Sequence, residues 1–299
     1  MSGRRNVIVE LRVPFCLDDS ALCRKSVFSG HDLLRVQKYA AALQREIEAN
    51  RGQFEDCKAV AIRFCGGQAT ALGEGLLKCL SALRKTVEVI PDGPISVRAG
   101  LSDFNAATAT WFMRLRAKRF DLEALSVDPV AFSYLNPRDR LGAIPLIREG
   151  YLQVPSHCGL GYVLAYGYKL AGHTDALATV TRCANLIAAS DVEHVILERI
   201  PRVSKKSDDD AMADSQLARY REVLCASGFS EYLPGIFARP GKKDPFLSLD
   251  ATGCERIGFG LGAYTLIDGV SSRNTRDFDL YCENSEDYEA ITAEVVQKH

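Results

Sequence analysis

Two cysteines close to the N-terminus have the spacing of a metal-binding loop. Six residues separate Cys16 from Cys23, and Ser20 lies between them. Iron–sulfur clusters are held by thiolates from closely spaced loop cysteines, because one short loop can then reach several irons. The spacing therefore makes this loop a candidate cluster site. The alternative is that Cys16 and Cys23 are ordinary buried or loop thiols, since cysteine is also a common small core residue.

A second loop of interest follows the next apolar run. It contains Cys65, a further candidate thiolate, and the glycine pair Gly66 and Gly67. Glycine lets a backbone turn tightly or approach a bound molecule closely. This loop is therefore a candidate cofactor contact, and the alternative is a tight turn between a strand and a helix.

The elements that must position these loops alternate between β-branched runs and amphipathic helical stretches. The expected strands are residues 6–13, 58–64, 95–99, 121–126, 161–166 and 194–200. The expected helices are residues 33–49, 74–85, 105–118, 175–189 and 213–227. This alternation predicts an α/β fold, a partial (β/α)6 TIM-like barrel with a parallel sheet. The loops at the carboxyl ends of the strands form the working face of such a barrel, and both candidate loops lie there.

The last third of the sequence predicts a small α+β extension. We expect an exposed loop at residues 203–210, strands at 231–237 and 256–259, and a last helix near 286–296. The predicted domains are therefore the partial barrel, residues 1–205, and a C-terminal extension, residues 206–299, that closes the open side of the barrel.

Composition limits the classes of function. The 299 residues are 47% hydrophobic and 25% charged, as in globular proteins. A net charge of −1 gives no electrostatic reason to expect nucleic acid or an anionic membrane as partner. No apolar run is long enough to span a bilayer, so the expected location is the cytoplasm. Ten cysteines without secretory features indicate thiols or metal ligands rather than a disulfide framework.

Several motifs, taken in order, resemble the oxygen-independent coproporphyrinogen III oxidase and heme-chaperone family of radical S-adenosylmethionine (SAM) enzymes. Residues 13–23, with VPFC after the first strand, are similar to the C-x3-C-x2-C cluster loop of these enzymes. Residues 64–70 (FCGGQAT) resemble the GGGTP loop of the family, and residues 166–174 resemble its YGLPGQT loop. Residues 237–240 (FARP) and 258–263 (GFGLGA) resemble its FARP and GxGxGA stretches.

The resemblance implies a tetrapyrrole or other small-molecule substrate, a role in heme metabolism, and a 4Fe-4S cluster and SAM as cofactors. Cys16 and Cys23 would ligate the cluster, and Ser20 or Cys65 would complete it. Gly66 and Gly67 of the glycine-rich loop would approach SAM, and Arg98 is the third residue assigned to the cofactor site. An electron-donor protein is an expected partner, and the sequence assigns no catalytic residue.

Several positions depart from the family pattern where the cofactors would bind. Ser20 replaces the middle cysteine, and a hydroxyl is harder to deprotonate than a thiol and a poorer ligand for iron. Arg98 stands where the family has an acidic residue that receives the amino group of SAM, and Leu125 stands where it has a glutamine. Arg12, Arg63 and Arg98 stand near strand ends, where they pair either with porphyrin carboxylates or with carboxylates of the protein.

These observations leave three functional hypotheses. The first is a coproporphyrinogen III oxidase-like radical SAM protein with a degenerate cluster motif. The second is a catalytically silent relative that binds heme, a porphyrin or a partner protein through the same cavity. The third is an unrelated small-molecule enzyme that uses the barrel without iron, because a fold alone does not fix chemistry.

Overall fold

The architecture is a parallel sheet covered by helices, as expected from the sequence. A computed structural model describes residues 4–17, 22, 28–101, 106–136, 158–170, 175–201 and 207–297. Six strands form the central sheet in the order β9-β8-β7-β6-β4-β1, and every neighbouring pair is parallel. They are β1 (Arg5–Arg12), β4 (Cys57–Cys65), β6 (Ile95–Gly100), β7 (Arg119–Leu125), β8 (Gly159–Tyr166) and β9 (His194–Arg199). The predicted partial TIM-like barrel is confirmed.

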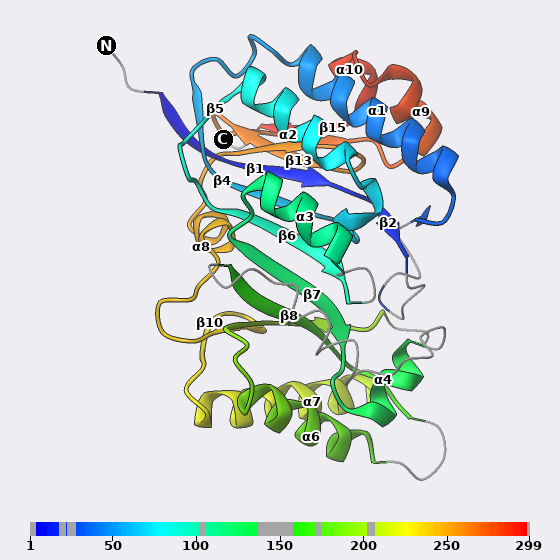
Figure 1. The fold of residues 1–299 in the computed structure, drawn as a ribbon, viewed down its shortest axis with the longest axis vertical. Coiled ribbons are helices and arrows are strands. Elements are labelled where there is room, and N and C mark those ends of the chain that lie inside the picture. The colour runs from blue at the N-terminus through cyan, green and yellow to red at the C-terminus, as the bar shows by residue number, and fades with distance from the viewer. Residues whose placement is uncertain are drawn as a thin grey trace.

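Helices follow the strands and cover the sheet (Figure 1). They are α1 (Leu33–Ala49), α2 (Gly75–Thr86), α3 (Ala106–Leu115), α4 (Pro129–Leu135), α6 (Ala176–Ala188) and α7 (Ser207–Ala226). Helix α1 begins where the Asp32 side chain accepts a hydrogen bond from the amide of Arg35, 3.0 Å away, which satisfies a first-turn donor. Its buried stripe includes Val36, Tyr39 and Leu43, the 3.6-residue spacing of a helix that packs one face on a core.

Several shorter strands and helices accompany the central sheet. They are β2 (Phe15–Cys16), β3 (Phe28–Ser29), the 3-10 helix η1 (Ala69–Leu72), β5 (Glu88–Val89), α8 (Pro245–Ala251), α9 (Phe278–Asn284) and α10 (Tyr288–Ile291). Strands β2 and β3 pair with each other in a small separate sheet. That pairing fixes the start and end of the loop in which the sequence places the cluster motif.

The C-terminal third extends the sheet at both edges. Strand β12 (Arg256–Phe259) pairs in parallel with β1, and β13 (Tyr264–Ile267), β14 (Val270–Asn274) and β15 (Thr292–Gln297) continue from it in antiparallel order. On the opposite edge, β10 (Ser230–Leu233) and β11 (Ile236–Ala238) form an antiparallel hairpin that pairs with β9.

Three local predictions in this region are wrong. The single strand expected at 231–237 is a hairpin, whose turn contains Gly235 at a φ of +73°. The loop expected at 203–210 is helical from Ser207 onward. The helix expected near 286–296 ends at Ile291, and the chain then forms β15, because pairing with β14 outweighs the local helical pattern.

Candidate functional site

A cavity of about 410 Å³ lies at the carboxyl ends of the barrel strands. Side chains of alternate strand residues point to the same face of a sheet, so each strand contributes residues spaced by two. Glu10 and Arg12 come from β1, Arg63 and Cys65 from β4, and Glu198 from β9. The other lining residues are Leu22, Gly66, Gly67, Arg98, Glu123, Ile196, Ile236, Phe246, Leu247, Asp250 and Arg256. The end of the barrel that was predicted to carry the functional site therefore contains a cavity, and many of its lining residues are charged.

Arg98 of β6 is held between two carboxylates, one from the adjacent strand β7 and one from β9, two strands further along the sheet. Its guanidinium forms ion pairs with Glu123 of β7 and Glu198 of β9, and Arg98 Nη2 donates to Glu198 Oε2 over 2.9 Å. Burial raises the pKa of Glu198, but Arg98 outweighs it and the pKa lies below its ordinary value. Burial and the charge of Glu198 raise the pKa of Glu123 above its ordinary value, against the effect of Arg98. One guanidinium thus serves the buried carboxyl group of Glu123 and the partly exposed one of Glu198.

The Cys65 thiol lines the cavity and is hydrogen-bonded to a carboxylate. Its Sγ donates a hydrogen bond to Glu10 Oε1 over 2.8 Å. Burial and the neighbouring charge of Glu10 raise the pKa of Cys65 to about 12. Burial also raises the pKa of Glu10, but Arg256 and Arg12 outweigh it and the pKa falls below its ordinary value. At neutral pH the pair is therefore a thiol next to a carboxylate.

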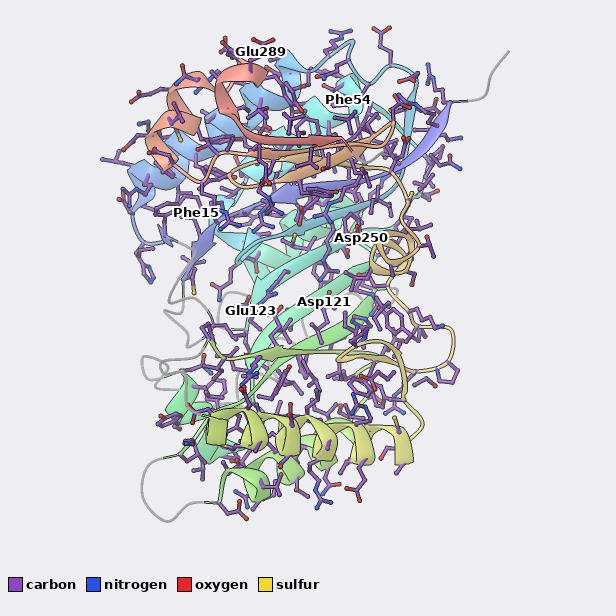
Figure 2. All side chains as sticks on the ribbon, turned by 180° about the vertical axis from the view of Figure 1, so that it is seen from behind. Phe15, Phe54, Asp121, Glu123, Asp250 and Glu289 are labelled. Atoms are coloured by element: carbon purple, nitrogen blue, oxygen red, sulfur yellow. The ribbon has the colours of Figure 1, made fainter. Side chains whose placement is uncertain are left out.

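A deeper group of charges supports the cavity. Arg63 donates to Asp121 over 2.9 Å and to Asp244 over 2.6 Å, and Asp121 also contacts His194, 3.2 Å away. Burial raises the pKa of Asp121, but Arg63 and His194 outweigh it and the pKa falls below its ordinary value. Figure 2 shows Asp121 and Glu123 on the same strand near the middle of the sheet. Arg63, Asp121, Asp244 and His194 thus form a second group of paired residues beneath the cavity.

Each of the four lining arginines has a carboxylate partner. Arg12 lies 3.5 Å from Glu10, and Arg256 pairs with Glu10 and with Asp250, 3.2 Å away. Arg63 and Arg98 are paired as described above. The arginines that the sequence placed at strand ends therefore pair with carboxylates of the protein, which was one of the two predicted alternatives.

The glycines of the second loop are required by contact with the first loop. A Cβ on Gly67 would lie 2.4 Å from the carbonyl oxygen of Phe15 and 2.7 Å from that of Val13. Gly66 has a φ of +95°, which favours glycine. The amide of Gln68 donates to the same Phe15 carbonyl oxygen over 2.8 Å. Packing of the chain on itself thus accounts for both glycines, which also line the cavity.

Of the four predicted metal ligands, Cys16 and Cys65 lie among the described residues, and they differ in where they lie. Cys16 is buried in β2 and is not among the described residues that line the cavity, whereas Cys65 lines it. Ser20 and Cys23 lie outside the described residues. The ligand roles of all four stay predictions.

The carboxylates of the site were not predicted from the sequence. Glu10, Glu123 and Glu198 directly follow apolar residues within the largely buried strands β1, β7 and β9. A carboxylate in a buried strand requires a partner, because an unpaired buried charge is costly. That signal was present in the sequence, but it does not reveal which arginine each carboxylate meets.

Comparison with solved structures supports the fold, whereas comparisons of the sequence find no relative. No protein-family profile matches the sequence, and no curated protein matches it. Among solved structures, the chain shares the fold of radical SAM enzymes. Coproporphyrinogen III oxidase from Escherichia coli, described as a radical SAM enzyme, is similar with a TM-score of 0.80 and 15% identity, over 99% of this chain and 73% of that one. The structure of anSMEcpe with bound AdoMet is similar with a TM-score of 0.53 and 13% identity, over 95% of this chain and 82% of that one.

The described part of the site does not fit the cofactors that this fold family implies. Iron is ligated by thiolate, whereas the Cys65 thiol is hydrogen-bonded to the Glu10 carboxylate and Cys16 is buried in β2. Within the described ranges, no three His, Cys, Asp or Glu side chains are grouped as they would be around a metal ion. Arg98, which the sequence predicted as a SAM contact, is a cation already paired with Glu123 and Glu198. In the same described ranges, no helix is both long and apolar enough to cross a membrane.

Proposed function

We propose that this chain is a coproporphyrinogen III oxidase-like cytoplasmic protein that binds a small molecule in the charged cavity without reductive cleavage of SAM. The observation that carries the proposal is the Glu123–Arg98–Glu198 ion pair at the carboxyl ends of the strands. Arg98, the residue that the resemblance assigns to the SAM contact, is thereby occupied by carboxylates of the protein. The hydrogen bond from Cys65 to Glu10 supports the same conclusion, because this thiol already has a carboxylate partner within the protein.

The lining chemistry favours a ligand that carries carboxylates, and a tetrapyrrole of heme metabolism is the first candidate. A volume of about 410 Å³ lies within the range of small-molecule pockets. Arg12 is the most exposed of the lining arginines, and its 3.5 Å distance to Glu10 makes it the weakest of the pairs. A ligand carboxylate would replace Glu10 at Arg12 at low cost, because Glu10 keeps its ion pair with Arg256.

An active radical SAM enzyme is the second candidate. The contact between the two loops favours it, because Gly67 and Gln68 pack on Phe15 and would bring a cluster loop next to a SAM loop. In that case Cys16, Cys23 and Ser20 or Cys65 would hold the cluster, and an electron-donor protein would be required. Gly66, Gly67 and Arg98 would then contact SAM.

Anaerobic reconstitution with iron and sulfide separates the two candidates. We expect iron well below the roughly four atoms per chain of a 4Fe-4S cluster, no 5′-deoxyadenosine from SAM under reduction, and saturable binding of heme followed by absorbance. The Arg12→Met variant should bind heme at least tenfold more weakly, and Lys78→Met, which removes an exposed charge from α2, should bind it unchanged. Stoichiometric iron together with 5′-deoxyadenosine would refute the proposal and establish the enzyme.

Ser20→Cys tests how far the first site has diverged. If only the missing thiolate prevents cluster binding, this variant should reach full iron content. We expect it to stay low in iron, because Cys16 is buried in β2 and is not among the described residues that line the cavity. Full occupancy in Ser20→Cys would show a damaged cluster site within an otherwise competent enzyme.

A further inference from the structure

The opposite end of the barrel contains a small basic cavity. It has a volume of about 160 Å³ and lies at the amino ends of β6 and β7, against the start of α8. Its lining residues are Pro94, Ile95, Ser96, Lys118, Arg119, Lys243, Asp244, Pro245 and Phe246. The volume suits a small ion or a single functional group, since drug-sized ligands occupy pockets of about 300 to 1,000 Å³.

Arg119 has unused hydrogen-bonding capacity in this cavity. The side chain is deeply buried, with the residue 8% exposed. Its Nη2 donates to the carbonyl oxygen of Lys242 over 2.7 Å, but Nη1 is buried without a hydrogen-bond partner in the described part of the chain. A buried charged donor without an acceptor is costly, so an acceptor is expected to occupy the cavity when the protein is at work.

The surrounding charges show which kind of acceptor fits. Lys118 and Lys243 are exposed at the rim, and neither forms an ion pair with another described residue. Asp244 is the one carboxylate among the lining residues, and its charge is already compensated. Its Oδ2 accepts from Arg63 over 2.6 Å, and its Oδ1 accepts from the amide of Phe246 over 2.8 Å. The lining therefore presents three cations against one neutralised carboxylate.

We propose that this cavity binds a phosphate-sized oxyanion, either free or as the phosphate end of a larger molecule. Arg119 Nη1 donates to the anion, and Lys118 and Lys243 supply charge from the rim. The site differs from the charged cavity at the other end of the barrel. Arg63 and Phe246 lie between the two cavities. Both residues line the large cavity, and Phe246 also lines the small one. Arg63 donates a hydrogen bond to Asp244, which lines the small cavity.

Calorimetric titration of the full chain with inorganic phosphate tests the proposal, with chloride used to keep ionic strength constant. We expect saturable binding that weakens at least tenfold in Lys118→Met/Lys243→Met and is lost in Arg119→Met. The double variant changes only exposed side chains, so it keeps the test valid if Arg119→Met folds poorly. Lys78→Met, which removes an exposed charge elsewhere, should bind phosphate as the wild type does.

A parallel titration with glycerol 3-phosphate identifies the source of the anion. Binding of inorganic phosphate alone supports a free ion, and binding of both supports the phosphate end of a larger ligand. The proposal fails if neither compound binds saturably, or if the double lysine variant and Lys78→Met have equal affinity for phosphate.

Discussion

At the scale of single residues, the guanidinium of Arg98 is the group on which most of the site depends. Replacing it with methionine leaves the buried carboxyl group of Glu123 next to the partly exposed Glu198 without a counter-charge. Breaking a buried ion pair by removing one partner costs about 3–5 kcal/mol. We therefore expect Arg98→Met to lower the free energy of unfolding by about that amount in urea denaturation.

The matched comparison is an exposed pair. Arg221 and Glu231 form an ion pair at the surface, so Arg221→Met should cost less than about 1 kcal/mol. Adding Glu123→Gln and Glu198→Gln to Arg98→Met should restore much of the lost stability, because no buried charge then lacks a partner. Equal losses in Arg98→Met and Arg221→Met would contradict the role given to the buried network.

Glu46 gives a prediction about pH. This carboxyl group accepts hydrogen bonds from the amide of Gly260, from Asn274 and from Tyr281. Burial nevertheless raises the pKa of Glu46 from 4.5 to about 7, because desolvation outweighs these bonds. The folded state then holds this proton more tightly than the unfolded state, so the contribution of Glu46 to stability is complete below pH 4.5 and is lost as the pH rises through 7.

The expected size of this loss is about 3 kcal/mol. Urea denaturation at pH 5 and pH 8 should show a smaller difference in stability for Glu46→Gln than for the wild type. Glu48 lies on the same helix and is exposed, so Glu48→Gln should keep the wild-type difference. If Glu46→Gln retains it too, the buried carboxyl is not the group that titrates.

At the scale of elements, the contact between the first two loops fixes the mouth of the barrel. A methyl group on Gly67 would overlap backbone atoms of Phe15. Backbone atoms cannot move aside as the end of a flexible side chain can. Overpacking of this kind costs about 1–3 kcal/mol. We expect Gly67→Ala to lower the free energy of unfolding by this amount and to raise the rate of Cys16 alkylation, measured by mass spectrometry, because β2 must shift.

A second glycine separates steric overlap from backbone strain. Gly253 has a φ of +77°, and a Cβ there would meet nothing within 4 Å. Gly253→Ala should therefore cost about 1–2 kcal/mol through its backbone alone, and it should leave Cys16 alkylation unchanged. An unchanged rate in Gly67→Ala as well would show that the loop contact does not shield β2.

Local signals predicted the elements well, and contacts between distant elements explain the errors. Helix α1 has the predicted bounds because a capping aspartate and a regular apolar stripe act within one segment. The expected helix near 286–296 was wrong because β15 is specified by pairing with β14. The same limit applies to the site. Its arginines were predicted at strand ends, but Arg98 meets Glu198 a hundred positions later, which no local pattern reveals.

At the scale of the whole molecule, the end of the chain holds its beginning in place. Phe278 of α9 lies 4.9 Å from Phe28 and 6.2 Å from Tyr39, measured between ring centroids, and Phe15 lies 5.4 Å from Tyr39. These rings join α9, α1 and the two short strands β2 and β3. Helix α9 therefore packs on the two strands that flank the loop in which the sequence places the cluster motif. About 250 residues of chain separate α9 from these strands.

This arrangement predicts that a change near the C-terminus alters the first loop. Phe278→Ala removes a buried ring, which costs about 3–5 kcal/mol, and it should raise the rate of Cys16 alkylation because β2 and β3 lose the ring that packs on them. Leu280 is exposed on the same helix, so Leu280→Ala should change stability by less than about 0.5 kcal/mol and leave alkylation unchanged. If Phe278→Ala lowers stability while Cys16 stays protected at low denaturant, the aromatic cluster stabilises the fold without holding the loop.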